Sequence, residues 1–127
     1  GLATADETVE SAAKLGQKLG KKPVHVRETP GFVVNRVLLA MMNEAIRLAE
    51  NGVASIPDID EAMKLGAGFP MGPFKLADLV GLDVIEHACE SIYRELGDPK
   101  FRPPVMLKQH VRAGRLGRKS RQGFYKY

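Results

Sequence analysis

Cysteine is nearly absent from this sequence of 127 residues, and tryptophan is absent altogether. The single cysteine, Cys89, excludes an internal disulfide, and no group of cysteine and histidine residues has the spacing of a metal site. No apolar run approaches the ~20 residues that a membrane-spanning helix needs. We therefore expect a fold held together by its apolar core, with no metal site and no membrane span.

Aromatic residues are also scarce, at 6% of the chain, and no nucleic-acid-binding motif is recognisable. The 19 lysines and arginines exceed the 15 acidic residues, so the formal charge of +4 mildly favours anionic partners. Several of these cations lie between Arg112 and Arg121, where their charges suit a phosphate. On this pattern alone a solvated tail is the favoured interpretation, and we expect no nucleic-acid partner.

The overall composition is that of an ordinary globular protein, with 44% hydrophobic and 27% charged residues. The length suits one compact domain. The first residues include Asp6, Glu7 and Glu10, where a signal peptide would carry a basic flank and an apolar block. The sequence therefore predicts a cytoplasmic protein.

The first part of the chain predicts one helix and one strand. Residues 3–19 carry acids in the first turns and lysines in the last, and Gly20 follows as a stop. Residues 23–27 alternate apolar and polar side chains after a proline, which is typical of a strand. Because a lone strand cannot form a sheet, it belongs to a sheet whose other strands lie elsewhere or pairs with another chain. We take this as the first sign of a fragment.

The rest of the sequence predicts helices only. The longest is expected over residues 30–50, with Thr29 as its N-cap, and its first half is apolar on nearly every side. Such a helix is buried all round or contacts a second subunit. Ser55 and Asp58 resemble a capping box. It starts a third helix that we expect to end at residues 65–66. The remaining expectations are a loop at 66–73 and helices at 74–80 and 84–96. A last short helix follows Pro103 and Pro104 and ends at Gly114, and a basic loop with an aromatic ending completes the chain.

Asn35 is the strongest candidate functional residue. The helical spacing places its amide on the same face as Phe32, Leu39 and Met42, so a polar group is set among apolar side chains. Burying it without a partner would cost ~1 to 3 kcal/mol, so something must bond to it. Two interpretations stay open: the amide caps a neighbouring backbone group, which is the commoner case, or it binds a ligand.

No complete catalytic site is legible in the sequence. His25 and His87 fall on polar faces, His110 stands beside the basic loop without a paired carboxylate or nucleophile, and Cys89 lies on an apolar stripe as an inert core thiol. There is also no G-x-G-x-x-G motif after a strand, and hence no cradle for a dinucleotide.

Four ordered blocks of the sequence resemble the 3-hydroxyacyl-CoA dehydrogenase family. They are residues 30–36 (PGFVVNR), 62–74 (AMKLGAGFPMGPF), 78–83 (DLVGLD) and 117–127 (GRKSRQGFYKY). Residues 100–104 and 107–114 are most similar to the short-chain branch, the bacterial 3-hydroxybutyryl-CoA dehydrogenases.

The resemblance implies a mainly α fold of the type found in the C-terminal domain of 6-phosphogluconate dehydrogenase. Residues 29–127 would form this helical domain, which binds the acyl-CoA substrate and forms a homodimer through the helix at 30–50. Residues 1–28 would be the last helix and strand of a truncated Rossmann domain. That missing N-terminal domain would bind most of the NAD or NADP, so no tight cofactor binding is expected here.

Two residues of this chain match functional positions of the family. Asn35 matches an asparagine that positions the substrate, which makes the ligand-binding interpretation of Asn35 the favoured one. An amide bonds an acyl oxygen without titrating, and so suits that task. Lys119 matches a basic residue that reaches the cofactor from the C-terminal loop. The catalytic histidine and its orienting glutamate lie upstream in the family, so the fragment itself is expected to be inactive.

Two alternatives accompany this hypothesis. One is a non-catalytic structural dimer module, like the lens crystallins derived from this family. The other is a neighbouring dehydrogenase group of the 6-phosphogluconate type, against which the blocks at 30–36 and 68–74 favour the acyl-CoA branch.

Overall fold

The computed structural model describes residues 33–127, and in this range the chain is helical. Four α-helices precede the C-terminal third: α2 (Val34–Glu50), α3 (Ile56–Ala67), α4 (Pro73–Val80) and α5 (Leu82–Leu96). They are followed by the 3-10 turn η1 (Pro99–Phe101), helix α6 (Val105–Arg112) and the 3-10 turn η2 (Arg118–Ser120). The described range contains no strand, only two isolated bridges that involve Gln122. The mainly α fold expected from the sequence is confirmed.

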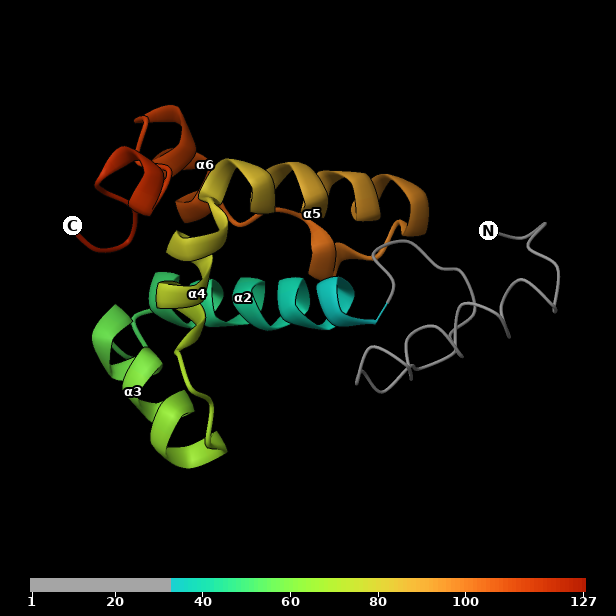
Figure 1. The fold of residues 1–127 in the computed structure, drawn as a ribbon. Helices are drawn as coiled ribbons and strands as arrows, with labels where there is room; N and C mark the ends of the chain where they lie inside the picture. The colour runs from blue at the N-terminus through green and yellow to red at the C-terminus, as the bar shows by residue number, and fades with distance from the viewer. Residues whose placement is uncertain (1–32) are drawn as a thin grey trace, which may run out of the picture.

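Helices α2 and α5 form the two long rods of the fold and run in opposite directions (Figure 1). Helix α4 contacts both of them, η1 lies against both, and α3 packs on α4 at one side. Helix α6 packs on α5, and the C-terminal residues return to η2 and α4. The end of the chain therefore lies over the connection between α4 and α5.

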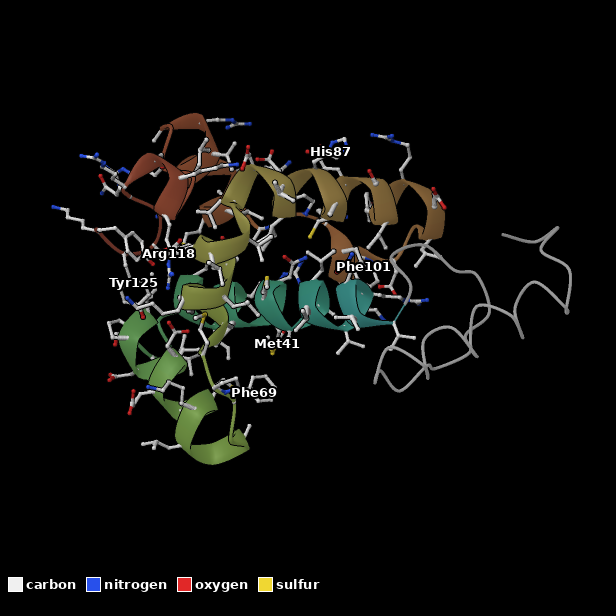
Figure 2. All side chains as sticks on the ribbon, in the orientation of Figure 1. Met41, Phe69, His87, Phe101, Arg118 and Tyr125 are labelled. Atoms are coloured by element: carbon white, nitrogen blue, oxygen red, sulfur yellow. The ribbon has the colours of Figure 1, made fainter. Side chains whose placement is uncertain are left out.

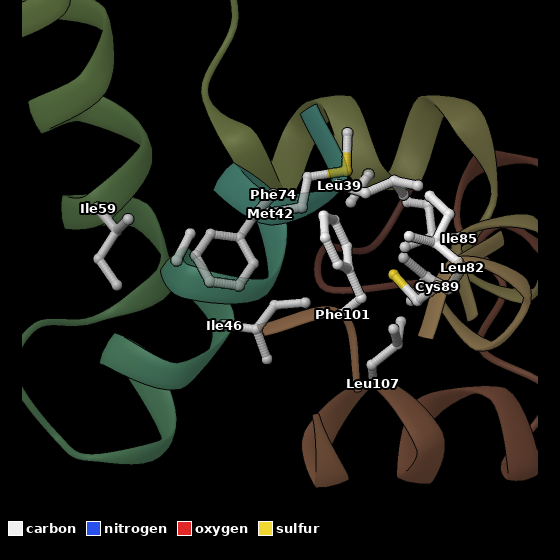
Figure 3. Close-up of a cluster of buried hydrophobic side chains, with 13 residues drawn as sticks. Leu39, Met42, Ile46, Ile59, Phe74, Leu82, Ile85, Cys89, Phe101 and Leu107 are labelled. Atoms are coloured by element: carbon white, nitrogen blue, oxygen red, sulfur yellow. The ribbon is translucent and has the colours of Figure 1, made fainter. Parts of the chain in front are cut away.

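One apolar cluster fills the space between these helices (Figure 3). Phe74, Leu82, Ile85, Phe101 and Leu107 in this cluster are at most 1% exposed. They come from α4, α5, η1 and α6, so every one of these elements contributes to the same core. The other members of the buried cluster are Leu39, Met42, Ala45, Ile46, Ile59, Ala77, Cys89 and Ile92.

The helix boundaries agree with the capping residues and glycines in the sequence, but two of the expected boundaries are corrected. Ser55 caps α3 as expected, since its Oγ accepts a hydrogen bond from the backbone N–H of Asp58 at 3.2 Å. The helix does not end at residues 65–66, however, because the left-handed residue that terminates it is Gly68, with φ of 71°. The loop that was expected over 66–73 is correspondingly shorter. Pro73 belongs to α4, at the first helical position, where its missing N–H costs nothing.

Helix α2 has a buried apolar face and a second apolar face that is exposed. Leu39, Met42 and Ile46 are at most 6% exposed, whereas Val34 and Val37 are 66% and 62% exposed. The apolar character of the helix on nearly every side is thus confirmed, while burial all round is not.

Four predictions lie outside the described residues: the helix at 3–19, the strand at 23–27, the cap at Thr29 and the helix start at Pro30. Within the described range, no helix combines the length and the apolar character that a membrane span requires.

Candidate functional site

An apolar cavity of about 160 Å³ lies between α2 and the α4–α5 connection. Its polar residue is Asn35. The apolar lining consists of Leu38, Leu39 and Met42 from α2, Val80 from α4, and Val84, Ile85 and Ala88 from α5. Val80 and Val84 are 44% and 49% exposed, so the cavity opens to the surface beside them. The space suits a small apolar group with a polar atom next to Asn35.

The amide of Asn35 is exposed, which corrects the expectation that it is buried among apolar side chains. It lies in the first turn of α2 and borders the cavity. It makes no hydrogen bond to any of residues 33–127. Its donor and acceptor therefore stay available to a bound molecule, and the capping interpretation has no partner in the described part of the chain.

The buried amide of α2 is Asn43, eight residues further along the same face. Asn43 is 0% exposed, and its Nδ2 donates a hydrogen bond to the carbonyl oxygen of Lys100 at 3.1 Å. Its Oδ1 also accepts from the Cys89 thiol at 3.6 Å. Asn43 thus performs the structural task that sequence reasoning weighed for Asn35. Burial raises the pKa of the Cys89 thiol to about 11, which confirms Cys89 as an inert core residue.

Lys119 stands at the turn between α4 and α5. Its Nζ forms an ion pair of 2.5 Å with Oδ1 of Asp83, in the first turn of α5, and both side chains are partly exposed, at 46% and 41%. The hydrogen bond from Lys119 lowers the pKa of the Asp83 carboxyl. Gly81 makes this turn with φ of 109°, a conformation that favours glycine, and the end of the Lys119 side chain packs against it. The residues on either side of the turn, Val80 and Val84, line the cavity of Asn35.

Two buried carboxylates at the two ends of α4 were missed by sequence reasoning. Asp60 accepts hydrogen bonds from the backbone N–H groups of Phe74 and Lys75 and from the hydroxyl of Tyr125. Asp78 accepts three hydrogen bonds as well, all from residues 124–127. The available signal was the position of Asp78 inside α4, whose other residues are almost all apolar.

The C-terminal residues are accordingly held against the fold and are not a freely solvated tail. Burial, and then the hydrogen bond to Asp78, raise the pKa of the Tyr127 hydroxyl to about 12. Burial, and then the hydrogen bond to Asp60, also raise the pKa of the Tyr125 hydroxyl. Both tyrosine hydroxyls therefore keep their protons at neutral pH and donate hydrogen bonds to the carboxylates.

Neither histidine in the described range is placed for proton transfer at Asn35. His87 is exposed on the outer side of α5, away from α2, as expected (Figure 2). The Nδ1 of His110 lies 2.8 Å from the carbonyl oxygen of Met106, and its ring packs on Phe124. His25 lies outside the described residues. Residues 33–127 hold no group of acids, histidines or cysteines that could bind a metal ion.

Comparisons with known proteins agree on one family. Residues 31–127 match the model described as "3-hydroxyacyl-CoA dehydrogenase, C-terminal domain". The whole chain is 51% identical to a probable 3-hydroxybutyryl-CoA dehydrogenase of Bacillus subtilis and 49% identical to the 3-hydroxybutyryl-CoA dehydrogenase of Clostridioides difficile. It spans only 44% and 45% of these two relatives. The crystal structure of (S)-3-hydroxybutyryl-CoA dehydrogenase from Ralstonia eutropha superposes with a TM-score of 0.96 at 47% identity, over 100% of this chain and 45% of that one.

Proposed function

Because this chain belongs to the 3-hydroxyacyl-CoA dehydrogenase family, as its C-terminal domain, we propose that it forms the substrate-facing part of an enzyme that interconverts 3-hydroxyacyl-CoA and 3-ketoacyl-CoA. The observation that carries the proposal is the amide of Asn35, exposed beside an apolar cavity and without a hydrogen bond to any residue in the range 33–127. The experiment is turnover of 3-ketobutyryl-CoA and NADH by the full-length protein.

Asn35 has the chemistry that positioning an acyl group requires. Its Nδ2–H donates a hydrogen bond to the thioester oxygen or the 3-oxygen, and because an amide does not titrate, this bond persists at any working pH. The neighbouring cavity excludes water from the acyl end of the substrate. A volume of about 160 Å³ suits a short acyl chain, in keeping with the 3-hydroxybutyryl-CoA named for the relatives.

The residues at the α4–α5 turn fit an anionic cofactor. The Lys119 ammonium is 46% exposed, so it can exchange its ion pair with Asp83 for a cofactor oxygen, and we assign to it the contact with NAD or NADP. When bound, the nicotinamide supplies the site that accepts or donates hydride. The rest of the cofactor would be held by an N-terminal Rossmann domain, to which we assign residues 1–28.

The 127-residue chain alone should show no dehydrogenase turnover. Moving the proton requires a histidine and an orienting carboxylate, which the family carries upstream of this segment, and His87 and His110 are placed elsewhere. Oxidation of NADH by the purified chain with 3-ketobutyryl-CoA checks this expectation. Turnover above the enzyme-free rate would contradict it.

A homodimer through the helix at 30–50 is the second part of the proposal. Val34 and Val37 expose a contiguous apolar face on α2, which water-soluble monomers seldom tolerate. The full-length protein should therefore show the mass of a dimer by light scattering at micromolar concentration. Changing both valines to aspartate should give the mass of a monomer, because two charges would be buried at the interface.

A control for this experiment is Val105→Asp on α6, where the valine is equally exposed, at 64%. This variant should keep the dimer mass. A monomer in the unmodified protein, or a dimer that survives the double change on α2, would rule out this interface. The alternative, a non-catalytic dimer module, also predicts a dimer, but it predicts that Asn35 can be replaced without loss of function.

The cytoplasmic location of the protein stays a prediction.

A further inference from the structure

We infer that Asp78 is a positioning residue: by holding the C-terminal tail (residues 113–127) against α4, it sets Lys119 at the start of α5. The inference rests on the proposed cofactor role of Lys119 and adds to it the group on which that role depends. Asp78 is 1% exposed and lies in the last turn of α4, so it has no direct access to a ligand.

Among residues 33–127, the three hydrogen bonds that reach the Asp78 carboxylate all come from the tail. Oδ1 accepts from the backbone N–H of Phe124 at 2.9 Å, and Oδ2 accepts from the backbone N–H of Tyr125 at 3.0 Å. Oδ2 also accepts from the hydroxyl of Tyr127 at 2.8 Å. A buried carboxylate that is satisfied wholly by one segment fixes that segment in place, because its release would strand a buried charge.

The tail also packs directly on Asp78 at two glycines. A side chain at Gly117 would collide with the Asp78 carbonyl, and one at Gly123 with the Asp78 carboxylate. Just before Gly117, the carbonyl oxygen of Leu116 accepts from the backbone N–H of Leu82 at 2.9 Å. The segment from 118 to 122 is thus anchored at both ends on α4 and the start of α5.

Lys119 lies inside this anchored segment, in η2. Ser120 closes the loop, since its Oγ accepts from the backbone N–H of Leu116 and donates to the carbonyl oxygen of Gln122, both at 2.8 Å. The ion pair of Lys119 with Asp83 is partly exposed on both sides. Such pairs contribute little to stability, so this pair alone would not hold the tail. The position of Lys119 follows from the buried contacts of Asp78.

The test measures cofactor kinetics of the full-length enzyme with Asp78→Asn. One carboxylate oxygen is replaced by an amide nitrogen, which donates and cannot accept a hydrogen bond, so the tail is held less firmly and Lys119 is no longer fixed at the start of α5. We expect the KM for NADH to rise about 10-fold, as for the loss of one charge-assisted contact, with kcat changed less than about 2-fold. Lys119→Gln should give the same change. The double variant should show no further rise, because the two residues act in one pathway.

Asp60→Asn is the matched structural control. Asp60 is 5% exposed and binds the same kinds of donor, two backbone N–H groups and a tyrosine hydroxyl. Only the hydroxyl, of Tyr125, belongs to the tail, and the two backbone donors lie at the start of α4, so in Asp60→Asn the backbone contacts of the tail with Asp78 stay in place. It should lower Tm by an amount similar to Asp78→Asn while the KM for NADH stays within about 2-fold. Tyr127→Phe removes one donor only. It should raise the KM in the same direction, by less, even if Asp78→Asn fails to fold.

Three outcomes overturn the inference. The first is an unchanged KM for NADH in folded Asp78→Asn, or in Tyr127→Phe if the former does not fold. The second is that Asp78→Asn raises the KM for NADH by the same factor in the Lys119→Gln background, or that Asp60→Asn raises this KM as much as Asp78→Asn does. The third is an unchanged KM in Lys119→Gln itself, which removes the cofactor role of Lys119 as well. That third outcome leaves the assignment of Asn35 and the turnover of 3-ketobutyryl-CoA standing, so the two failures are distinguishable.

Discussion

Replacing Asn35 with alanine should lower kcat/KM of the full-length enzyme for 3-ketobutyryl-CoA by ~10-fold to 1000-fold, the scale set by one positioned hydrogen bond in a water-poor site. The melting temperature should hardly change, because the amide is exposed and bonds to no residue of the described range. Steady-state kinetics and a thermal melt on the same preparation provide both numbers.

Asn43→Ala is the matched control on the same helix. Asn43 is 0% exposed and bonds to the Lys100 carbonyl, so truncation removes this hydrogen bond and leaves a cavity between α2, η1 and α5. The lost hydrogen bond and the cavity together should cost ~1 to 3 kcal/mol and lower Tm by several degrees, while kcat/KM stays near normal. Near wild-type kcat/KM in Asn35→Ala would remove the catalytic contribution proposed for this chain. It would favour the structural dimer module.

Phe101→Ala should be the most destabilising single change in the described range. Phe101 is 0% exposed, in η1, which packs on both α2 and α5 (Figure 2). Truncating a buried phenylalanine costs ~3 to 5 kcal/mol, because apolar contacts are lost and a cavity remains. We expect Tm to fall by ~10 °C or more, measured by circular dichroism or calorimetry.

Phe69→Ala provides the comparison. Phe69 lies in the loop after α3, is only half-buried and stands apart from the buried cluster. Its loss should lower Tm by no more than a few degrees. Equal shifts for the two variants would contradict the assignment of Phe101 to the core that joins the two long helices.

Local signals accounted for most of the helical boundaries. The cap at Ser55, the stop at Gly97 and the break at Gly81 are decided by residues within a few positions of the boundary, so a sequence can reveal them. Gly66 and Gly68 show the limit. Both are glycines near a helix end, and only the backbone conformation of Gly68 identifies which one terminates α3.

The site was predicted in part, for a similar reason. Helical spacing places Asn35 and Asn43 on one face of α2, but it does not reveal where the neighbouring helices end. Asn43 lies against η1 and α5 and is buried, whereas Asn35 is exposed at the edge of the cavity. The sequence singled out Asn35 alone, and Asn43 was missed. The task of Asp78 depends on residues 46 to 49 positions later in the chain, which no local pattern reveals.

The most direct measurement is NADH oxidation by the full-length protein with 3-ketoacyl-CoA substrates of butyryl and palmitoyl length. We predict turnover that saturates with the butyryl-length substrate and is much slower with the palmitoyl-length one, because the cavity beside Asn35 has a volume of only about 160 Å³. Absence of NADH consumption above the enzyme-free rate with both substrates would contradict the proposal that this helical domain serves a 3-hydroxyacyl-CoA dehydrogenase.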